Sequence, residues 1–307
     1  MRLSLLKNKI LNNIFHSPVL TASGTYGYGN EVESIVDVSK LGGIITKSVT
    51  RYPREGNPPP RIFETDSGMI NSIGLANVGV DAFCNEKLPY LNKLKTNVIV
   101  NIAGTALDDY KETLDIIESS NGNHIGYEIN ISCPNVKEGG MEFGVSCKMT
   151  EKLTKTLRLL TDKLLIMKLS PNVSDISSIA KAAENGGADM ISAINTVVGM
   201  GINIYTKKPK VHTIFGGLSG PAIKPVGIAN VYKIFKSVNI PIIGLGGIAK
   251  AEDIIEYILA GADLVQIGTL NYKYPDIGIT ILDRLEQLCI KLGIKDLSGL
   301  KGQIRLD

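Results

Sequence analysis

The segment 130–135, Asn-Ile-Ser-Cys-Pro-Asn, combines the residue types best suited to chemistry at the end of a short apolar run. Alternation of side chains along a strand puts Asn130 and Ser132 on one face of that run. Cys133 begins the following loop, where a thiol is accessible, and a thiol beside a cationic group can ionise and act as a nucleophile or a base. We therefore expect a reactive thiol at Cys133. The remaining cysteines are expected to be small, buried, apolar side chains: Cys84, Cys147 and Cys289.

Two lysines, Lys47 and Lys168, stand at the ends of other apolar runs. Runs that are buried on both faces offer an ammonium no solvated side, so an anionic partner must offset its desolvation. Together with Asn101, Asn130 and Asn195, these lysines are expected to converge on one rim of the fold. Such a set suits a cofactor with many hydrogen-bonding ring atoms, stacked beneath a small anionic substrate. A Schiff-base role for Lys168, as in barrel aldolases, is a competing interpretation.

Two glycine motifs indicate a phosphate group on the ligand. The sequence Gly-Leu-Gly-Gly-Ile occupies residues 244–248, and Gly268-Thr269 follows the last apolar run. Glycine lets the backbone approach a ligand closely, and successive N–H groups can hold a phosphate. The loops after strands seven and eight are the common phosphate site of an α/β barrel, so the two motifs together predict a phosphate-bearing ligand. Each motif alone could equally form a tight turn.

The composition limits the classes of function. The chain has 307 residues, of which 44% are hydrophobic and 21% charged, with a net charge of +3. These are globular proportions, and neither the charge nor the aromatic content of 6% indicates a nucleic-acid partner. The spacing of cysteines and histidines is not typical of a metal or iron–sulfur site, so no metal is expected in this chain. Lys7 and Lys9 interrupt the first apolar stretch, and no run approaches the ~18 apolar residues of a membrane span, so we expect a cytoplasmic protein.

Eight short apolar runs rich in Ile and Val predict strands that are buried on both faces of a parallel sheet. They cover residues 19–23, 43–48, 97–103, 126–132, 164–170, 189–195, 240–244 and 263–268. Helical periodicity lies between several of them, at residues 150–162, 175–186, 229–237 and 251–261. This alternation predicts an α/β fold, a (β/α)8 TIM barrel that forms one domain over residues 1–307. A doubly wound sheet is the alternative, but the chain lacks its glycine fingerprint after the first strand.

Three segments between the predicted strands are longer than a simple crossover requires, at residues 49–96, 133–149 and 196–239. The third contains a predicted hairpin near residues 205–210. In a barrel these long insertions emerge at the C-terminal face, where active sites are built. Long loops at that face typically serve as lids or binding walls.

The order and spacing of these motifs resemble those of the class 1 dihydroorotate dehydrogenases, flavin barrels of pyrimidine synthesis, over nearly the whole chain from Thr21 to Thr269. The motifs are Lys47-Ser48, Asn-Ser-Ile-Gly-Leu at 71–75, Asn-Ile-Ser-Cys-Pro-Asn at 130–135, Asn195-Thr196 and Gly-Gly-Leu-Ser-Gly-Pro-Ala-Ile-Lys-Pro at 216–225. The resemblance implies oxidation of (S)-dihydroorotate to orotate in de novo UMP biosynthesis. It also implies that Cys133 is the catalytic base, which removes the C5 proton while a hydride leaves C6 for the flavin.

The same resemblance implies one FMN per chain and indicates which residues bind the FMN and the substrate. FMN would be bound by Ser23, Lys47, Ser48, Asn101, Asn130, Lys168, Ile194, Gly220, Gly246, Gly247, Gly268 and Thr269. Dihydroorotate would be bound by Lys47, Asn71, Ser72, Ile73, Gly74, Leu75, Asn130, Asn195 and Thr196. Lys168 would lie near the N1–C2 edge of the flavin and stabilise its anionic reduced ring.

Within class 1, the segments 136–144 and 218–222 resemble subclass B. Its catalytic subunits pass electrons to NAD+ through a partner subunit that carries FAD and a [2Fe–2S] cluster, and they form a homodimer core inside a heterotetramer. One alternative is subclass A, a homodimer that reduces fumarate and typically has Pro-Gly where this chain has Lys137-Glu138. Another is a related dihydropyrimidine dehydrogenase. A Schiff-base aldolase or a non-catalytic phosphate-ligand barrel would be a different class, and its preparation would be colourless.

Overall fold

The computed structural model describes residues 6–131 and 143–305, and within them eight parallel strands close into a barrel. The strands are β3 (Val19–Thr21), β4 (Gly43–Ile45), β7 (Asn97–Ala103), β8 (Gly126–Asn130), β9 (Leu164–Leu169), β10 (Met190–Ala193), β15 (Ile242–Leu245) and β16 (Leu264–Ile267). Each pairs with the next in chain order, and β16 returns to β3 with Val265 opposite Val19. Each predicted apolar run overlaps one of these strands, so the (β/α)8 prediction is confirmed and the doubly wound alternative is excluded.

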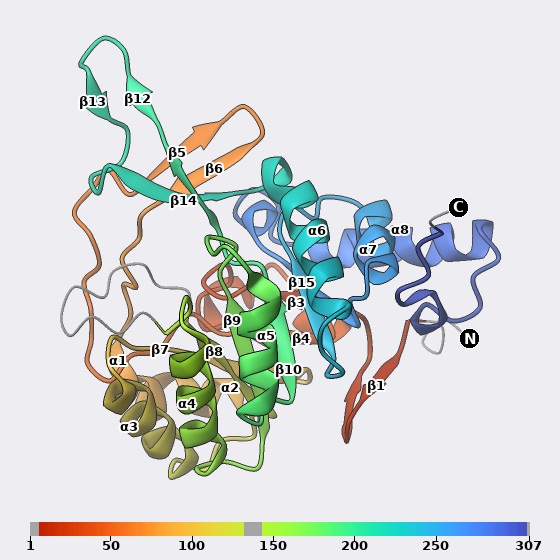
Figure 1. Ribbon diagram of the computed structural model, residues 1–307, viewed down its shortest axis with the longest axis horizontal. Helices are drawn as coiled ribbons and strands as arrows, with labels where there is room; N and C mark the ends of the chain where they lie inside the picture. Colours follow the sequence, from red (N-terminus) through yellow and green to blue (C-terminus); the bar gives the residue numbers. More distant parts are fainter. Residues whose placement is uncertain (1–5, 132–142, 306–307) are drawn as a thin grey trace.

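Helices surround the barrel and connect its strands (Figure 1). They are α1 (Gly79–Ala82), η3 (Phe83–Lys87), α2 (Leu88–Leu91), α3 (Leu107–Glu118), α4 (Cys147–Arg158), α5 (Ile176–Asn185), α6 (Lys224–Phe235), α7 (Ala251–Leu259) and α8 (Ile277–Lys291). Short 3-10 turns are η1 (Asn30–Val32), η2 (Val38–Lys40), η4 (Pro221–Ile223), η5 (Thr269–Tyr272) and η6 (Ser298–Leu300). The four predicted helices are present as α4 to α7. Helix α6 starts five residues earlier than expected because Pro225 fits the first turn of a helix, where its missing N–H leaves no bond unmade.

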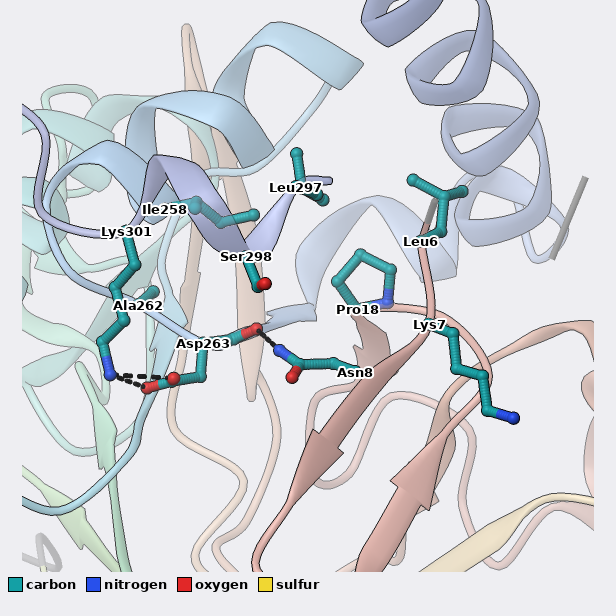
Figure 2. Close-up of a pocket in the computed structure, with 10 residues that line it drawn as sticks. All are labelled: Leu6, Lys7, Asn8, Pro18, Ile258, Ala262, Asp263, Leu297, Ser298 and Lys301. Atoms are coloured by element: carbon teal, nitrogen blue, oxygen red, sulfur yellow. Dashed lines mark hydrogen bonds and ion pairs between the residues drawn. The ribbon is translucent and has the colours of Figure 1, made fainter. Parts of the chain in front are cut away.

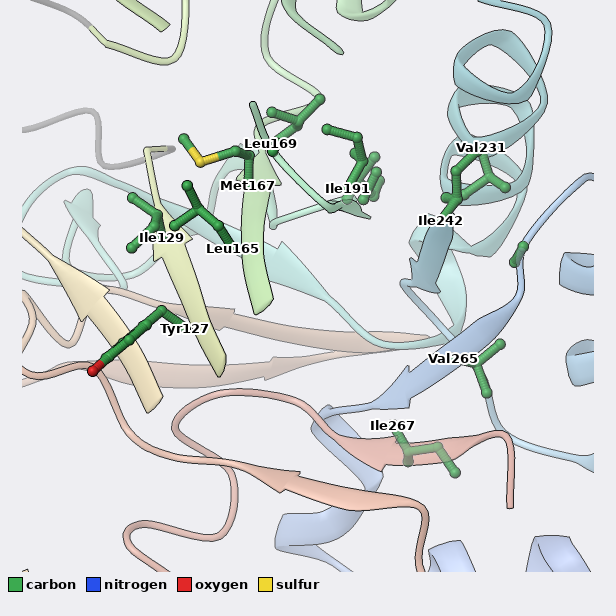
Figure 3. Close-up of a cluster of buried hydrophobic side chains, with 14 of the residues drawn as sticks. Tyr127, Ile129, Leu165, Met167, Leu169, Ile191, Val231, Ile242, Val265 and Ile267 are labelled. Atoms are coloured by element: carbon green, nitrogen blue, oxygen red, sulfur yellow. The ribbon is translucent and has the colours of Figure 1, made fainter. Parts of the chain in front are cut away.

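Alternation along the barrel strands separates an inner from an outer set of side chains. Figure 3 shows members of the outer set, such as Met167 and Val265, which form the core between the barrel and the helices. The inner set begins with an apolar layer that includes Ile99, Ile166 and Leu264. Two residues further along each of these strands the inner side chain is polar. The barrel interior therefore changes from apolar to polar towards the C-terminal ends of its strands.

The insertions after the second and sixth barrel strands meet in a separate sheet. Its strands are β5 (Ile62–Thr65), β6 (Gly68–Asn71), β11 (Val197–Met200) and β14 (Phe215–Ser219), in the order β11-β14-β6-β5. The hairpin of β12 (Ile202–Asn203) and β13 (Lys208–Pro209) projects beyond this sheet (Figure 1), which confirms the hairpin predicted near 205–210. Most of the insertion 133–149 lies outside the described residues.

A hairpin of β1 (Asn8–Ile10) and β2 (Asn13–Phe15) precedes the barrel, and a small cavity of about 20 Å³ lies beside it. Figure 2 shows the Lys301 ammonium reaching both oxygens of Asp263, at 2.8 and 2.7 Å, while Asn8 Nδ2 donates to the Asp263 carbonyl at 3.0 Å. A buried water needs about 10–15 Å³, so this space holds little more than one water. We interpret the cluster as a structural tie between the two ends of the described chain.

The described helices include none with the length and apolar character needed to span a bilayer. Within the same residues, His, Cys, Asp and Glu form no group of three or more that could hold a metal ion. Cys289 is buried as expected and Cys84 is half-buried. The expectation of a buried side chain at Cys147 is wrong, because this residue is exposed in the first turn of α4.

His124 predicts a pH dependence of stability. The residue is only 3% exposed, its Nε2 lies 2.7 Å from the Tyr127 hydroxyl, and burial together with the nearby Lys163 ammonium lowers its pKa from 6.5 to about 4. As the pH falls, His124 is therefore protonated at a higher pH in the unfolded chain than in the folded protein. The stabilisation is fully present above pH ~6.5 and is lost as the pH falls towards 4.

We expect the free energy of unfolding to fall by about 2 kcal/mol more between pH 7 and pH 5 in the wild type than in His124→Gln. Glutamine keeps a polar group for Tyr127 but does not titrate in this range. Urea unfolding of both proteins at the two pH values measures the difference. Equal pH dependence in the two proteins would contradict the assignment of a neutral buried His124.

Candidate active site

A cavity of about 1020 Å³ opens at the C-terminal ends of the barrel strands. One wall is the polar end of the barrel interior, through residues such as Lys168 and Gln266. The opposite wall is the sheet β11-β14-β6-β5, through residues such as Met69 and Gly217. Ligand pockets generally measure about 300–1,000 Å³, so this cavity has room for two molecules bound against each other.

Most residues predicted to bind the cofactor border this cavity. They are Ser23, Lys47, Ser48, Asn130, Lys168, Ile194, Gly220, Gly246, Gly247, Gly268 and Thr269. The residues predicted to bind substrate border it as well: Lys47, Asn71, Ser72, Ile73, Gly74, Leu75, Asn130, Asn195 and Thr196. Asn101 lies behind the wall, fully buried, where its Oδ1 accepts from the Ser48 hydroxyl at 2.6 Å. Cys133 lies outside the described residues.

Glu128 is the anionic partner that the sequence requires for Lys168. The Lys168 ammonium lies 3.2 Å from Glu128 Oε1, and the two side chains are 6% and 0% exposed. They come from the neighbouring strands β9 and β8, in which Asn130 pairs with Lys168 and Glu128 with Ile166. The Glu128 carboxylate thus keeps the Lys168 ammonium at the cavity wall.

Sequence reasoning missed Glu128 and its neighbour Gln266. The Gln266 side chain donates from Nε2 to Glu128 Oε2 at 2.6 Å, and its Oε1 has no hydrogen-bond partner among the described residues. A usable signal existed, because each is a polar residue inside an otherwise apolar buried strand. Glu128 also precedes Asn130 by two positions, which puts both on the inner face.

Lys47 brings a second positive charge to the cavity. It follows β4, its backbone N–H donates to the Gly27 carbonyl at 2.7 Å, and its half-buried side chain borders the cavity. Within the part of the chain that the structure describes, no carboxylate lies within ion-pair distance of it. Lys47 thus adds a positive charge to the residues that border the cavity.

A glycine turn closes the end of the cavity after β15. Gly247 has φ +71°, and a Cβ there would come within 2.7 Å of the Gly220 carbonyl oxygen, so the close approach of the two loops requires glycine. Burial raises the pKa of Tyr257 well above its usual value, and its neutral hydroxyl donates to the Gly246 carbonyl at 2.7 Å. The turn is thereby fixed. The backbone N–H of Gly247 has no acceptor among the described residues, which suits a phosphate site.

The predicted substrate segment Asn71–Leu75 is held from both sides by asparagines. The Asn57 side chain donates to the Ser72 carbonyl at 3.0 Å, and the Asn77 side chain donates to the Leu75 carbonyl at 2.7 Å. These bonds leave the hydroxyl of Ser72, which is buried at the cavity, without a partner among the described residues. The segment is thus ordered by bonds to its backbone and by Asn71 Nδ2, which donates to the Gly217 carbonyl at 3.2 Å, while the Ser72 hydroxyl stays open to a ligand among the described residues.

Asn130 and Asn195 meet on the barrel rim. The Asn195 side chain donates from Nδ2 to Asn130 Oδ1 at 3.3 Å, and its own Oδ1 accepts from the Thr196 N–H at 2.7 Å. Tyr110 donates to the Asn130 carbonyl at 2.9 Å from outside the barrel. Amide groups carry both donors and acceptors, so this pair can bind the N–H and C=O groups of a small heterocycle.

Comparison with known proteins identifies the family and supports the fold. The family model described as dihydroorotate dehydrogenase matches residues 5–289. The chain is 47% identical to a Bacteroides thetaiotaomicron protein named dihydroorotate dehydrogenase B (NAD(+)), catalytic subunit, over 94% of this chain and 95% of the relative. A protein of Thermodesulfovibrio yellowstonii with the same name is 45% identical over 98% of this chain and 99% of the relative.

A solved structure is similar in fold. The dihydroorotate dehydrogenase of Eimeria tenella, crystallised in complex with ferulenol, superposes with a TM-score of 0.82 at 23% identity. The alignment covers 97% of this chain and 88% of that one. At this identity the similarity shows the fold alone, and it agrees with the closed barrel described above.

Proposed function

The chain belongs to the dihydroorotate dehydrogenase family, and we propose that its cavity binds FMN and oxidises (S)-dihydroorotate to orotate in pyrimidine biosynthesis. The observation that carries this proposal is that all the residues predicted for the substrate, and all those predicted for the cofactor except Asn101, border one cavity. Relatives at 45–48% identity carry the name dihydroorotate dehydrogenase B (NAD(+)), catalytic subunit.

The polar groups at the cavity fit the parts of FMN. The Gly247 N–H and the neighbouring loop after β16 suit its phosphate, since these are the loops that commonly hold phosphate in barrels. The unpartnered Gln266 Oε1 suits a hydroxyl or ring N–H of the cofactor. Lys168 suits the edge of a ring that becomes anionic on reduction. When bound, FMN supplies the acceptor for the hydride that leaves the substrate.

The substrate side of the cavity suits a flat anion with ring amides. We propose that Lys47 binds the carboxylate of dihydroorotate, since its charge faces the cavity with no carboxylate of the described chain beside it. Asn130 and Asn195 would orient the ring by its amide N–H and C=O groups. In the sequence Cys133 comes three residues after Asn130, the last residue of β8, and we propose that its thiolate takes the C5 proton. Holding that proton acceptor beside an oriented substrate is what this chain contributes to the C–H cleavage.

The purified wild-type chain is expected to be yellow, with a flavin absorption band that is bleached by dihydroorotate under anaerobic conditions. Dihydrouracil serves as the control reductant, because it lacks the carboxylate that Lys47 is proposed to bind. An absorption spectrum with and without each compound makes the measurement. A chain that neither retains nor takes up FMN would refute the proposed function. Equal bleaching by dihydrouracil would instead favour a related dihydropyrimidine dehydrogenase.

We also propose that electrons leave this chain for NAD+ through a partner subunit carrying FAD and a [2Fe–2S] cluster, in an assembly built on a homodimer. Support comes from the relatives' designation as catalytic subunits. A second support is a set of exposed apolar side chains on this sheet and its hairpin that do not border the cavity: Met200, Ile202, Ile204 and Tyr205. Patches of this kind commonly mark protein contacts. Rapid reoxidation of the isolated chain by fumarate would instead favour the subclass A reading.

A further inference from the structure

Glu128 collects three side-chain donors from three other barrel strands. Its Oε1 accepts from Asn101 Nδ2 at 2.7 Å and from the Lys168 ammonium at 3.2 Å. Its Oε2 accepts from Gln266 Nε2 at 2.6 Å. The carboxylate is 0% exposed and does not border the cavity. It is a buried charge to which the proposed reaction assigns no direct contact.

The acceptor-only character of an ionised carboxylate fixes how its neighbours are oriented. Gln266 must turn its NH2 towards Glu128, so its carbonyl oxygen is directed elsewhere. That oxygen is buried, Gln266 borders the cavity, and the described residues offer Oε1 no donor. Asn101 is oriented in the same way, and its Oδ1 accepts from Ser48, which also borders the cavity. Glu128 thereby determines which side-chain atoms of Gln266 and Asn101 act as acceptors on the side of the cavity wall.

We propose that Glu128 is a positioning residue which presents Gln266 Oε1 as an acceptor to a hydroxyl or N–H donor of the bound flavin and holds the Lys168 ammonium against the flavin ring. This inference rests on the proposed function, since it needs a flavin in the cavity. It extends the binding set to Gln266, which contacts the cofactor, and to Glu128, which acts through its neighbours. Glu128 also places a negative charge behind Lys168, which moderates how strongly Lys168 favours a reduced, anionic ring.

The variant Glu128→Gln tests both parts of the inference. A glutamine at this position can still accept at one oxygen from Lys168 and Asn101, but its NH2 would face the NH2 of Gln266. To avoid two NH2 groups facing each other, Gln266 must rotate its amide by 180°. Its Oε1 then accepts from the new glutamine, and its Nε2, a donor, replaces Oε1 at the cavity. We therefore expect the dissociation constant for FMN to rise on the order of tenfold. The midpoint potential of the bound flavin is expected to become more positive, because Lys168 then acts without the opposing charge.

The measurements are fluorescence titrations of flavin-free protein with FMN and dye-equilibrated potentials of the loaded protein. Titration with lumiflavin, which lacks the ribityl chain, identifies the donor. A loss of affinity for FMN alone indicates a ribityl hydroxyl, and an equal loss for both indicates a ring N–H. Gln266→Met provides a second route if Glu128→Gln does not fold. It removes the acceptor while Glu128 remains, so FMN binding should again weaken about tenfold.

Glu118→Gln is the matched control. Glu118 is a carboxylate paired with Lys163 at 2.8 Å on the C-terminal turn of α3, and it does not border the cavity. This control should lower the melting temperature without changing FMN affinity or potential. The inference is overturned if Glu128→Gln and Gln266→Met behave like the control, with wild-type affinity and potential in the folded protein. Failure of the wild type itself to bind FMN would refute the proposed function, which is a different outcome.

Discussion

Replacing Cys133 with alanine is expected to slow the reduction of bound FMN by dihydroorotate by about two to four orders of magnitude. This is the usual contribution of a positioned general base. The C5 proton of the substrate is not acidic enough to leave to water at a useful rate, so removal of the thiolate removes the proton acceptor. Binding of FMN should be unchanged, because Cys133 is not among the residues proposed to hold the cofactor.

Anaerobic stopped-flow spectroscopy of the flavin band measures this rate. Cys147→Ala is the control, because Cys147 is an exposed cysteine on α4 and should leave the rate unchanged. Cys133→Ser should retain some activity that increases towards high pH, since a hydroxyl ionises far less readily than a thiol. A Cys133→Ala variant that reduces its flavin at the wild-type rate would remove Cys133 from the mechanism.

Lys168→Met is expected to lower the rate of flavin reduction by about 10²–10³-fold, the typical effect of losing one preorganised stabilising group. It should also destabilise the fold by about 3–5 kcal/mol, because it leaves the fully buried carboxylate of Glu128 without its cation. Stopped-flow reduction and urea unfolding measure the two effects separately. We therefore expect Lys168 to have two roles, one in flavin reduction and one in stabilising the barrel by pairing with Glu128.

The double variant Lys168→Met with Glu128→Gln separates these roles. Removing the unpaired charge should recover most of the lost stability, because breaking a buried pair is costly mainly through the charge that remains. The rate of flavin reduction should stay low, because the ammonium is still missing. Recovery of the rate together with stability would show that Lys168 acts on the fold alone.

The barrel could be predicted because its signal is local. Each apolar run that ends in small or polar residues corresponds to one strand. The helix predicted from residue 175 is present with Asp175 as its N-cap, whose side chain accepts from the Ser177 N–H at 3.0 Å. Lys168 and Asn130 could be identified for the same reason, since they stand at strand ends. The sheet that joins β6 to β14 could not, because its pairing links residues such as Asn71 and Gly217 that are far apart in the chain.

Other features depended on contacts that no local pattern encodes. The sequence required an anion near Lys168 but did not identify Glu128, because which strand supplies it depends on the stagger between β8 and β9. The contacts of Asn101 with Glu128 and Ser48 behind the cavity wall likewise join three different strands or strand ends, so no local pattern shows them. The exposure of Cys147 follows from the start of α4 at that residue, three positions before the predicted start.

The pairing of Asn71 with Gly217 also bears on how the protein is made. A ribosome that has emitted the chain only as far as the β12–β13 hairpin has already released Asn71 and the loop behind it, yet β14 has not been synthesised. The wall of the cavity that β6 and β14 form together is therefore completed late in biosynthesis, and a chain terminated at that point would carry six of the eight barrel strands without it.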